Sequence, residues 1–245
     1  FMAPGEWKDG WPQFNLGSDE VKYAYPIHAV EDKNRKRFNG NYHFRDDFDK
    51  DILNIRYRFL RTRREQWFNL SEKPGSLSLR LQQETCSGKA NPSFIGFHQS
   101  HLEGYAATAI RFKAKAENEK AGLLIFQNES HFYFLCKSVK EGTPMLELYK
   151  AKELLASQPL SIKNNKDLFL KIEAKKDKYA FWYAIKKNEW KLLLDNADGK
   201  YLSTKGAGGF VGCLYAMYAT SNGQPSGNAA LYDWFETKND DEVYK

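Results

Sequence analysis

The chain has 245 residues and a formal net charge of +6, a length that suits one large all-β domain or two smaller domains. Its basic residues are spread over almost every segment and accompany no nucleic-acid-binding motif, so we expect no nucleic-acid partner. No apolar run has the length of a membrane span, so we expect no membrane association.

The first forty residues do not have the pattern of a compact domain. Glu6 to Pro12 is rich in aromatic and turn residues, and a basic run follows at residues 33–37. Two tryptophans in a segment without a regular period usually pack on another surface. We therefore predict that residues 1–40 form a tail and linker that packs on a partner, ahead of a domain at residues 41–238 and a short tail at 239–245.

The rest of the chain has the pattern of antiparallel strands. Aromatic residues make up 15% of the sequence, which is natural for strands. Residues 121–126 are continuously apolar, as expected of a central strand that is buried on both faces. The only predicted helix is short, at residues 151–156. Further strands are predicted at residues 110–116, 131–135, 168–174, 179–185, 190–194, 208–217 and 229–235.

Tight turns between these segments predict an all-β fold, a two-sheet antiparallel sandwich of the jelly-roll type. Acidic motifs stand at both ends of it, Asp46-Asp47-Phe48-Asp49 and Asp233-Trp234-Phe235. This layout predicts that the first and last strands return to the same place.

The acidic motifs are the best candidate site. Calcium prefers carboxylate and carbonyl oxygens, and Asp46, Asp47, Asp49 and Asp233 supply carboxylates from both ends of the sandwich. An ion held there would be structural. The alternative is that these aspartates bind the backbone of turns, as aspartate commonly does near strand ends.

Other candidate sites are weaker. His98 and His101 have an odd spacing, which on a strand directs the two rings to opposite faces and disfavours zinc. The glycines at 206–212 lack the third glycine of a dinucleotide fingerprint, because Val211 stands in its place. No set of residues has the spacing of a catalytic site, so we assign no catalytic residue. Five aromatics are candidates either for stacking on sugar rings or for ordinary packing: Tyr105, Trp182, Tyr201, Tyr215 and Tyr218.

Several short motifs, taken together and in order, resemble glycoside hydrolase family 43. Residues 7–12 resemble the closing segment of that family's catalytic propeller. The remainder is similar to the C-terminal concanavalin A-like sandwich of its β-xylosidases and α-L-arabinofuranosidases. The motifs that carry this second resemblance are residues 45–49, 74–77, 92–96, 99–101, 121–123, 208–212 and 233–235.

The resemblance implies a non-catalytic accessory domain, because in this family the catalytic carboxylates belong to the propeller. It also implies a propeller partner, an enzyme that acts on xylose- or arabinose-containing plant polysaccharides, and a calcium ion between Asp46 and Asp233. Related β-xylosidases carry an aromatic in a loop before the Gly208–Gly212 motif, and residues 203–207 here have none. This departure weakens the case for a pocket-lining role.

An alternative function is a free-standing carbohydrate-binding module or lectin, with plant cell-wall oligosaccharide as ligand. The sequence assigns no substrate-binding residue for either function. The sequence leaves the location open, with a lean towards the periplasm or the exterior of a bacterial cell.

Overall fold

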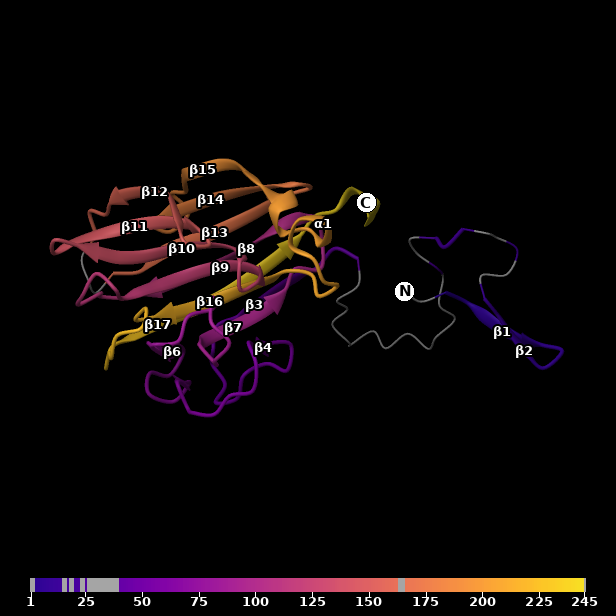
Figure 1. The fold of residues 1–245 in the computed structure, drawn as a ribbon, viewed down its shortest axis with the longest axis horizontal. Helices are drawn as coiled ribbons and strands as arrows, with labels where there is room; N and C mark the ends of the chain where they lie inside the picture. The colour runs from indigo at the N-terminus through magenta and orange to yellow at the C-terminus, as the bar shows by residue number, and fades with distance from the viewer. Residues whose placement is uncertain are drawn as a thin grey trace. The chain divides into compact units, whose positions relative to one another are not determined.

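The computed structural model describes residues 3–14, 17, 20–22, 25, 40–162 and 166–244. The chain divides into two compact units, Phe1–Arg37 and Phe38–Lys245, whereas the sequence placed the boundary after residue 40. The basic run at residues 33–37 lies outside the described residues. Figure 1 shows the strands of both units.

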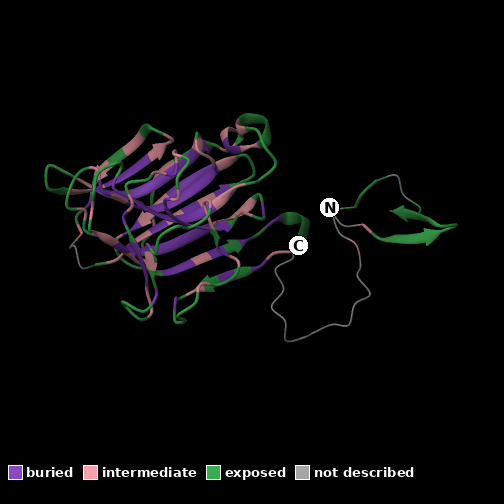
Figure 2. Ribbon diagram, turned by 60° about the horizontal axis from the view of Figure 1, so that its bottom comes forward, coloured by how far each residue is buried: buried purple, intermediate pink, exposed green. Residues whose placement is uncertain are grey.

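The first unit contains one β-hairpin, made of β1 (Gly5–Lys8) and β2 (Trp11–Phe14). Asp9 and Gly10 connect the strands, both with positive φ (50° and 80°), which is the conformation that tight two-residue hairpin turns require. All side chains of the two strands are exposed (Figure 2). An isolated two-stranded hairpin is only marginally stable in water, so packing on another surface would stabilise it.

The second unit consists of two antiparallel sheets. The seven-stranded sheet has the order β12-β11-β10-β9-β16-β7-β4, and the eight-stranded sheet has the order β15-β14-β13-β8-β17-β6-β5, with β3 paired to β17. The strands of the first sheet are β4 (Arg58–Phe59), β7 (Ser93–His98), β9 (Lys120–Asn128), β10 (His131–Lys140), β11 (Thr143–Lys150), β12 (Glu153–Pro159) and β16 (Leu214–Thr220). Those of the second are β3 (His43–Asp46), β5 (Phe68–Asn69), β6 (Leu77–Arg80), β8 (Glu103–Arg111), β13 (Leu168–Lys175), β14 (Lys178–Ala184), β15 (Lys191–Asp198) and β17 (Ala229–Asn239).

The core lies between the two sheets, where Leu123 and Ile125 of β9 and Leu170 and Ile172 of β13 are fully buried. The predicted central strand is confirmed, because β9 pairs with β10 on one side and β16 on the other. Buried strands fill the centre of the sandwich in Figure 2. The predicted all-β, concanavalin A-like sandwich is therefore confirmed.

The predicted meeting of the first and last strands is also confirmed. Strand β3 pairs with β17, so that Asp46 lies opposite Phe235. Strand β17 also pairs with β8 in the middle of the sheet. It runs to Asn239, one residue beyond the boundary drawn from the sequence, and Asp241 then accepts a hydrogen bond from the backbone of Glu103 (2.7 Å). The C-terminal segment is thus tied to the sandwich by the side chain of Asp241.

Three sequence-based assignments were wrong. The predicted helix at residues 151–156 lies mostly in β12, where pairing with β11 overrides local helix preference. The predicted strand at 110–116 ends at Arg111. The strand predicted from residue 208 begins at Leu214, because three glycines before it have positive φ, which is incompatible with an extended ladder (Gly208, Gly209 and Gly212).

The helices in the described part of the chain are a single turn each: η1 (Gly199–Leu202), α1 (Thr204–Ala207) and η2 (Glu242–Tyr244). No helix among the described residues is long and apolar enough to span a membrane.

Candidate functional site

Pairing of β3 with β17 places the opening and closing motifs of the sandwich side by side. Arg45 lies opposite Glu236 in this ladder, and His43 lies opposite Lys238. Because alternate residues share a face of a sheet, His43 and Arg45 lie on the outer face, while Phe44 between them is buried in the core. The two acidic motifs therefore meet at the outer face of the eight-stranded sheet.

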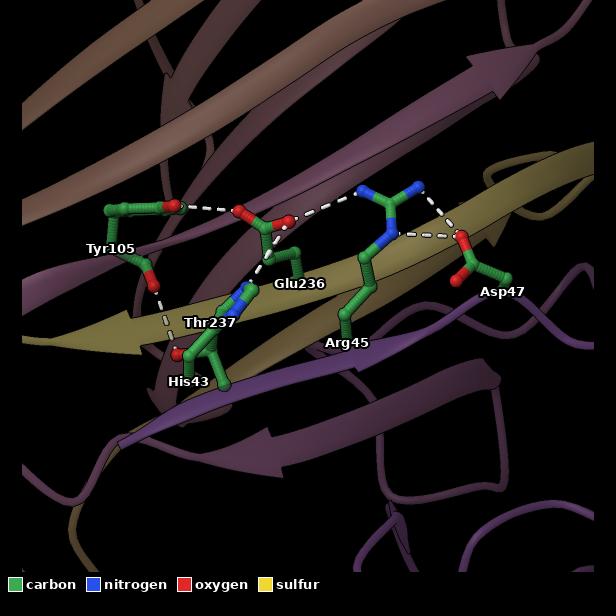
Figure 3. A network of polar contacts seen from close by, with 6 residues as sticks. All are labelled: His43, Arg45, Asp47, Tyr105, Glu236 and Thr237. Carbon is green, nitrogen blue, oxygen red and sulfur yellow. Dashed lines mark hydrogen bonds and ion pairs between the residues drawn. The ribbon is translucent and has the colours of Figure 1, made fainter. Parts of the chain in front are cut away.

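Arg45 joins the two motifs (Figure 3). Its guanidinium group binds Asp47 through Nη2 (2.6 Å) and Nε (2.8 Å) to the same oxygen, and binds Glu236 through Nη1 (3.2 Å). Glu236 also accepts a hydrogen bond from the Tyr105 hydroxyl (2.6 Å) and lies 3.4 Å from Nε2 of His43. A carboxylate with these partners is held in one orientation by three neighbouring side chains.

Arg45 also stacks on an aromatic ring. Its guanidinium carbon lies 4.3 Å from the centre of the Trp234 ring, a favourable cation–π distance. The indole packs on the small side chains of Ala107 and Ala109 and against Phe169. The ion pairs thus surround an aromatic cluster on the outer face of the sheet.

The surroundings of Glu236 set its charge. Burial alone would raise the pKa of this carboxyl, but hydrogen bonds from Tyr105, Arg45 and His43 outweigh burial and lower the pKa below its ordinary value of 4.5. Burial and the hydrogen bond to Glu236 raise the pKa of the Tyr105 hydroxyl. Glu236 therefore stays ionised and Tyr105 stays a hydrogen-bond donor.

Asp46 is engaged within its own turn. One oxygen of its carboxylate accepts a hydrogen bond from the backbone of Phe48 (3.0 Å), and this bond accommodates the positive φ of Phe48 (55°). Burial, followed by the nearby charge of Asp46, raises the pKa of Tyr57 well above its ordinary value. Since Asp46 lies opposite Phe235, its side chain points to the same face as that buried ring.

Asp233 lies in β17, the last strand of the sandwich. It is exposed and stands where a β-bulge shifts the pairing of β17 with β8 between Tyr232 and Trp234. Partial desolvation of its carboxyl raises the pKa of Asp233, as does the charge of Asp167, against the opposing effects of Arg111 and Arg45. The carboxylate is therefore surrounded by charges of both signs.

The donor chemistry of these aspartates suits calcium, but the contacts seen here engage Asp46 and Asp47 within the chain itself. Across the described ranges, no group of three or more His, Cys, Asp or Glu side chains is placed to hold a metal. Asp49 is exposed beyond β3. Calcium coordination by Asp46 and Asp233 stays a prediction.

Sequence reasoning missed Arg45. The signal was present, because Arg45 is a basic residue inside an otherwise acidic motif and Trp234 follows an aspartate in the closing motif. The contact between Arg45 and Trp234 becomes visible only once the first and last strands are known to pair.

The remaining candidate residues from the sequence do not come together in one site. His98 is exposed at the end of β7, whereas His101 is buried between the rings of Tyr42 and Tyr244. The five candidate aromatics divide between two environments. Tyr105, Trp182 and Tyr201 are partly exposed, and Tyr215 and Tyr218 are buried.

Comparison with known proteins identifies the family to which the chain is similar. Residues 45–238 match the family model described as "Beta xylosidase C-terminal Concanavalin A-like domain". The chain is 32% identical to a xylosidase/arabinosidase of Butyrivibrio fibrisolvens and 30% identical to a non-reducing end α-L-arabinofuranosidase of Bacteroides ovatus. Each alignment covers 96% of this chain, but only 45% and 44% of the respective relative.

A solved structure shows the same partial coverage. The structure titled "Bacteroides ovatus Xyloglucan PUL GH43B" superposes with a TM-score of 0.80 at 28% sequence identity, over 98% of this chain and 47% of that one. The chain thus spans a little under half the length of the proteins that it matches.

Proposed function

Because this chain belongs to the β-xylosidase C-terminal concanavalin A-like domain family, we propose that it is a non-catalytic accessory sandwich of a family 43 glycoside hydrolase. Its partner is a catalytic propeller, and the joined enzyme acts on xylose- or arabinose-containing plant polysaccharides. The names of the two relatives described above support this substrate class.

The observation that carries the proposal is an exposed apolar tip on the sandwich. Phe210 is 97% exposed and the neighbouring Val211 is 66% exposed. Single exposed apolar residues are common on protein surfaces, whereas adjacent ones form a patch of the kind that marks interaction sites. A partner that covered both side chains would remove their apolar area from water, which stabilises the complex by about 25 cal/mol per Å².

The loop that carries this tip is anchored at its base. Gln127 donates a hydrogen bond to the carbonyl of Gly208 (2.7 Å), and Asn128 donates one to the carbonyl of Ala207 (2.9 Å). The preceding turn of helix is capped by the Ser203 hydroxyl, which accepts from the backbone of Gly206 (3.1 Å). An anchored loop loses little conformational entropy when a partner binds it.

The hairpin of the first unit also exposes apolar side chains that a partner would cover. Trp7 and Trp11 are 78% and 74% exposed, and two indoles bury on the order of 400 Å² when covered. Each unit therefore presents apolar groups for a partner to cover. A propeller that has to be completed by residues 5–14 and also contacts Phe210 satisfies both requirements.

The test uses the propeller that this proposal places in the same enzyme, expressed alone and titrated with the full chain in a calorimeter. We expect saturable binding together with a gain in turnover or melting temperature of the propeller. Phe210→Ala should weaken binding without lowering the stability of the chain itself. The matched control is Ile55→Ala, because Ile55 is also an exposed apolar residue (90%) but lies on a different loop.

A free-standing carbohydrate-binding module is the second candidate, favoured by the aromatic side chains on the outer faces of both sheets. The same titration separates the two. Absence of propeller binding, together with affinity for xylan or arabinan, would contradict the accessory role and support the binding module.

A further inference from the structure

The outer face of the seven-stranded sheet carries a pocket of about 270 Å³. Its floor is formed by Phe132 and Phe134 of β10 and Tyr218 of β16, which belong to an apolar cluster separate from the core between the sheets. Phe134 and Tyr218 meet edge to face, with ring centres 4.9 Å apart. The pocket therefore has rigid aromatic walls.

A loop over residues 82–88 holds one side of the pocket in place. The hydroxyl of Tyr218 accepts a hydrogen bond from the backbone of Cys86 (3.0 Å). Thr220 lies within hydrogen-bonding distance of the carbonyls of Gln82 and Glu84 (3.3 Å each). Because strand β16 ties this loop down through side chains, the pocket is largely preformed.

Polar groups line the opposite side. Lys120 pairs with Glu147 (2.5 Å between Nζ and Oε2), and Tyr149 donates its hydroxyl to the same carboxylate oxygen (3.0 Å). The side chains of Lys120 and Glu147 are only 16% and 10% exposed. Nζ of Lys120 lies 4.9 Å from the centre of the Tyr149 ring. Such a pair is a fixed set of charged hydrogen-bonding groups at the edge of an aromatic surface.

These features define the ligand chemistry. The Lys120–Glu147 ion pair is neutral as a unit, and the exposed Lys152 adds one positive charge at the rim of the pocket. Aromatic side chains suit the apolar faces of a ring, while the ammonium group of Lys120 and the phenol group of Tyr149, which line the pocket, suit hydroxyls around its edge. The volume lies just below the usual range of about 300–1,000 Å³ for drug-sized ligands, which fits a single small ring.

We propose that this pocket binds one neutral sugar unit, either as a free pentose or as a residue of a plant polysaccharide. The proposal goes beyond the accessory role and does not require it. Sugar binding would give the sandwich an affinity for the substrate of the enzyme that it accompanies.

The pocket lies away from the proposed docking tip. The loop of Phe210 is bonded to Gln127 and Asn128 at one end of β9, and Lys120 is at the other end of this nine-residue strand. At about 3.3 Å per residue, the two ends are about 26 Å apart. A partner held at Phe210 can therefore leave Lys120 and Tyr149 open to a sugar.

The opposite sheet carries comparable aromatic rings that do not line the pocket. Nζ of Lys171 lies 4.9 Å from the ring centre of Trp182 and 4.7 Å from that of Trp190. Lys171 thus packs against these rings as Lys120 packs against the ring of Tyr149. Trp182 consequently provides a matched aromatic control on the other sheet.

The experiment is calorimetric titration of the full chain with D-xylose, L-arabinose, xylobiose and soluble arabinoxylan, supported by ligand-observed NMR. We expect saturable binding of at least one of these probes. Tyr149→Ala should weaken it about tenfold, which is the effect of losing one aromatic contact, and Trp182→Ala should leave it unchanged. Circular dichroism verifies that both variants are folded.

A second variant distinguishes loss of the binding site from misfolding of Tyr149→Ala. Thr85→Trp places an indole at the wall of the pocket without removing any of the hydrogen bonds described above, and it should also reduce binding. Binding of the free pentoses would indicate a site for one unit, and binding of arabinoxylan alone a site for residues within a chain. Both outcomes support the proposal.

Two outcomes overturn it: no saturable binding of any probe at millimolar concentration, or loss of binding in Trp182→Ala with retention in Tyr149→Ala. Propeller binding is measured separately with Phe210→Ala, so failure of the sugar site and failure of the accessory role are distinguishable.

Discussion

The guanidinium group of Arg45 lies 4.3 Å from the centre of the Trp234 ring, and so connects the first strand of the sandwich to the last. The same group binds Asp47 and Glu236. A structural role follows, because strand β3 sits at the side of the sheet and pairs only with β17 among the described strands. Arg45 adds side-chain contacts to that one backbone ladder.

Arg45→Met should lower the free energy of unfolding by about 1–2 kcal/mol, the sum expected for a cation–π contact and partly exposed ion pairs. Urea denaturation measures this loss. Lys175→Met is the control, because its ion pair with Glu173 involves a lysine that is 68% exposed, and the change there should stay below about 0.5 kcal/mol. Equal stabilities of Arg45→Met and the native chain would contradict the role given to Arg45.

Stability should fall in acid through Glu236. Its pKa in the folded chain is lowered from 4.5, because its hydrogen bonds outweigh the effect of burial. A carboxyl whose folded pKa is depressed stabilises the fold above its unfolded pKa, and this contribution is lost as the pH falls through the folded pKa. Unfolding free energies measured between pH 6 and pH 3 should therefore decrease more in the native chain than in Glu236→Gln.

The control for that measurement is Glu65→Gln, which also removes one carboxylate but from an exposed turn. It reports the effect of net charge alone. If Glu236→Gln and Glu65→Gln give the same pH profile, the network around Glu236 does not contribute to acid sensitivity.

The calcium hypothesis makes a separate prediction. An ion held by Asp46 and Asp233 binds only the folded chain, so excess calcium should raise the melting temperature relative to a chelator. Asp233→Ala should remove that difference, while Asp240→Ala, a change in another exposed aspartate, should retain it. Identical melting in calcium and chelator would show that Arg45 and the turn hydrogen bonds hold the two motifs without an ion.

The chain alone should not hydrolyse glycosides, because the proposed function assigns the carboxylates that flank the glycosidic bond to the propeller. Aryl xylosides and aryl arabinofuranosides are the substrates to assay, with the joined enzyme as the positive control. Turnover above buffer that disappears on substitution of an acidic residue within 41–238 would make the sandwich an enzyme in its own right.

Gly122 should tolerate no side chain. A methyl group there would lie against the carbonyl oxygen of Leu135 and 2.7 Å from Cα of Cys136 on the neighbouring strand. Gly122→Ala should therefore destabilise the fold by about 3 kcal/mol, as overpacking of a core does. Gly227→Ala is the control, because a methyl group there meets no atom within 4 Å, and urea denaturation should show a change within about 0.5 kcal/mol.

Much of the fold could be predicted where the signal is local. The unbroken apolar run at 121–126 indicated a central strand because a strand buries every side chain only when it has neighbours on both sides and both of its faces are covered. The alternation at 168–174 indicated β13, whose Leu168, Leu170, Ile172 and Ala174 are buried while the residues between them are partly exposed. Period and burial are properties of a single strand, so they appear in the sequence.

Features that depend on neighbouring strands could not be predicted from the sequence. Residues 151–156 have helix-compatible composition, yet pairing with β11 makes most of them part of an edge strand. Phe210 stands in an apolar motif that looks like the start of a strand, but the positive φ values of the surrounding glycines expose it. In both cases backbone geometry set by the tertiary fold outweighs local preference.

By itself, the sequence determined the fold class, the central position of the strand at 121–126 and the meeting of the first strand with the last, because hydrophobic periodicity and turn residues act over short distances. Only the tertiary structure decided what lies between the acidic motifs. The contacts of Arg45 with Trp234 and Glu236 join residues about 190 positions apart, and the pocket beside Tyr149 takes side chains from four strands and from the segments that connect strands. Such contacts arise from strand register, which is set by the packing of the whole sandwich.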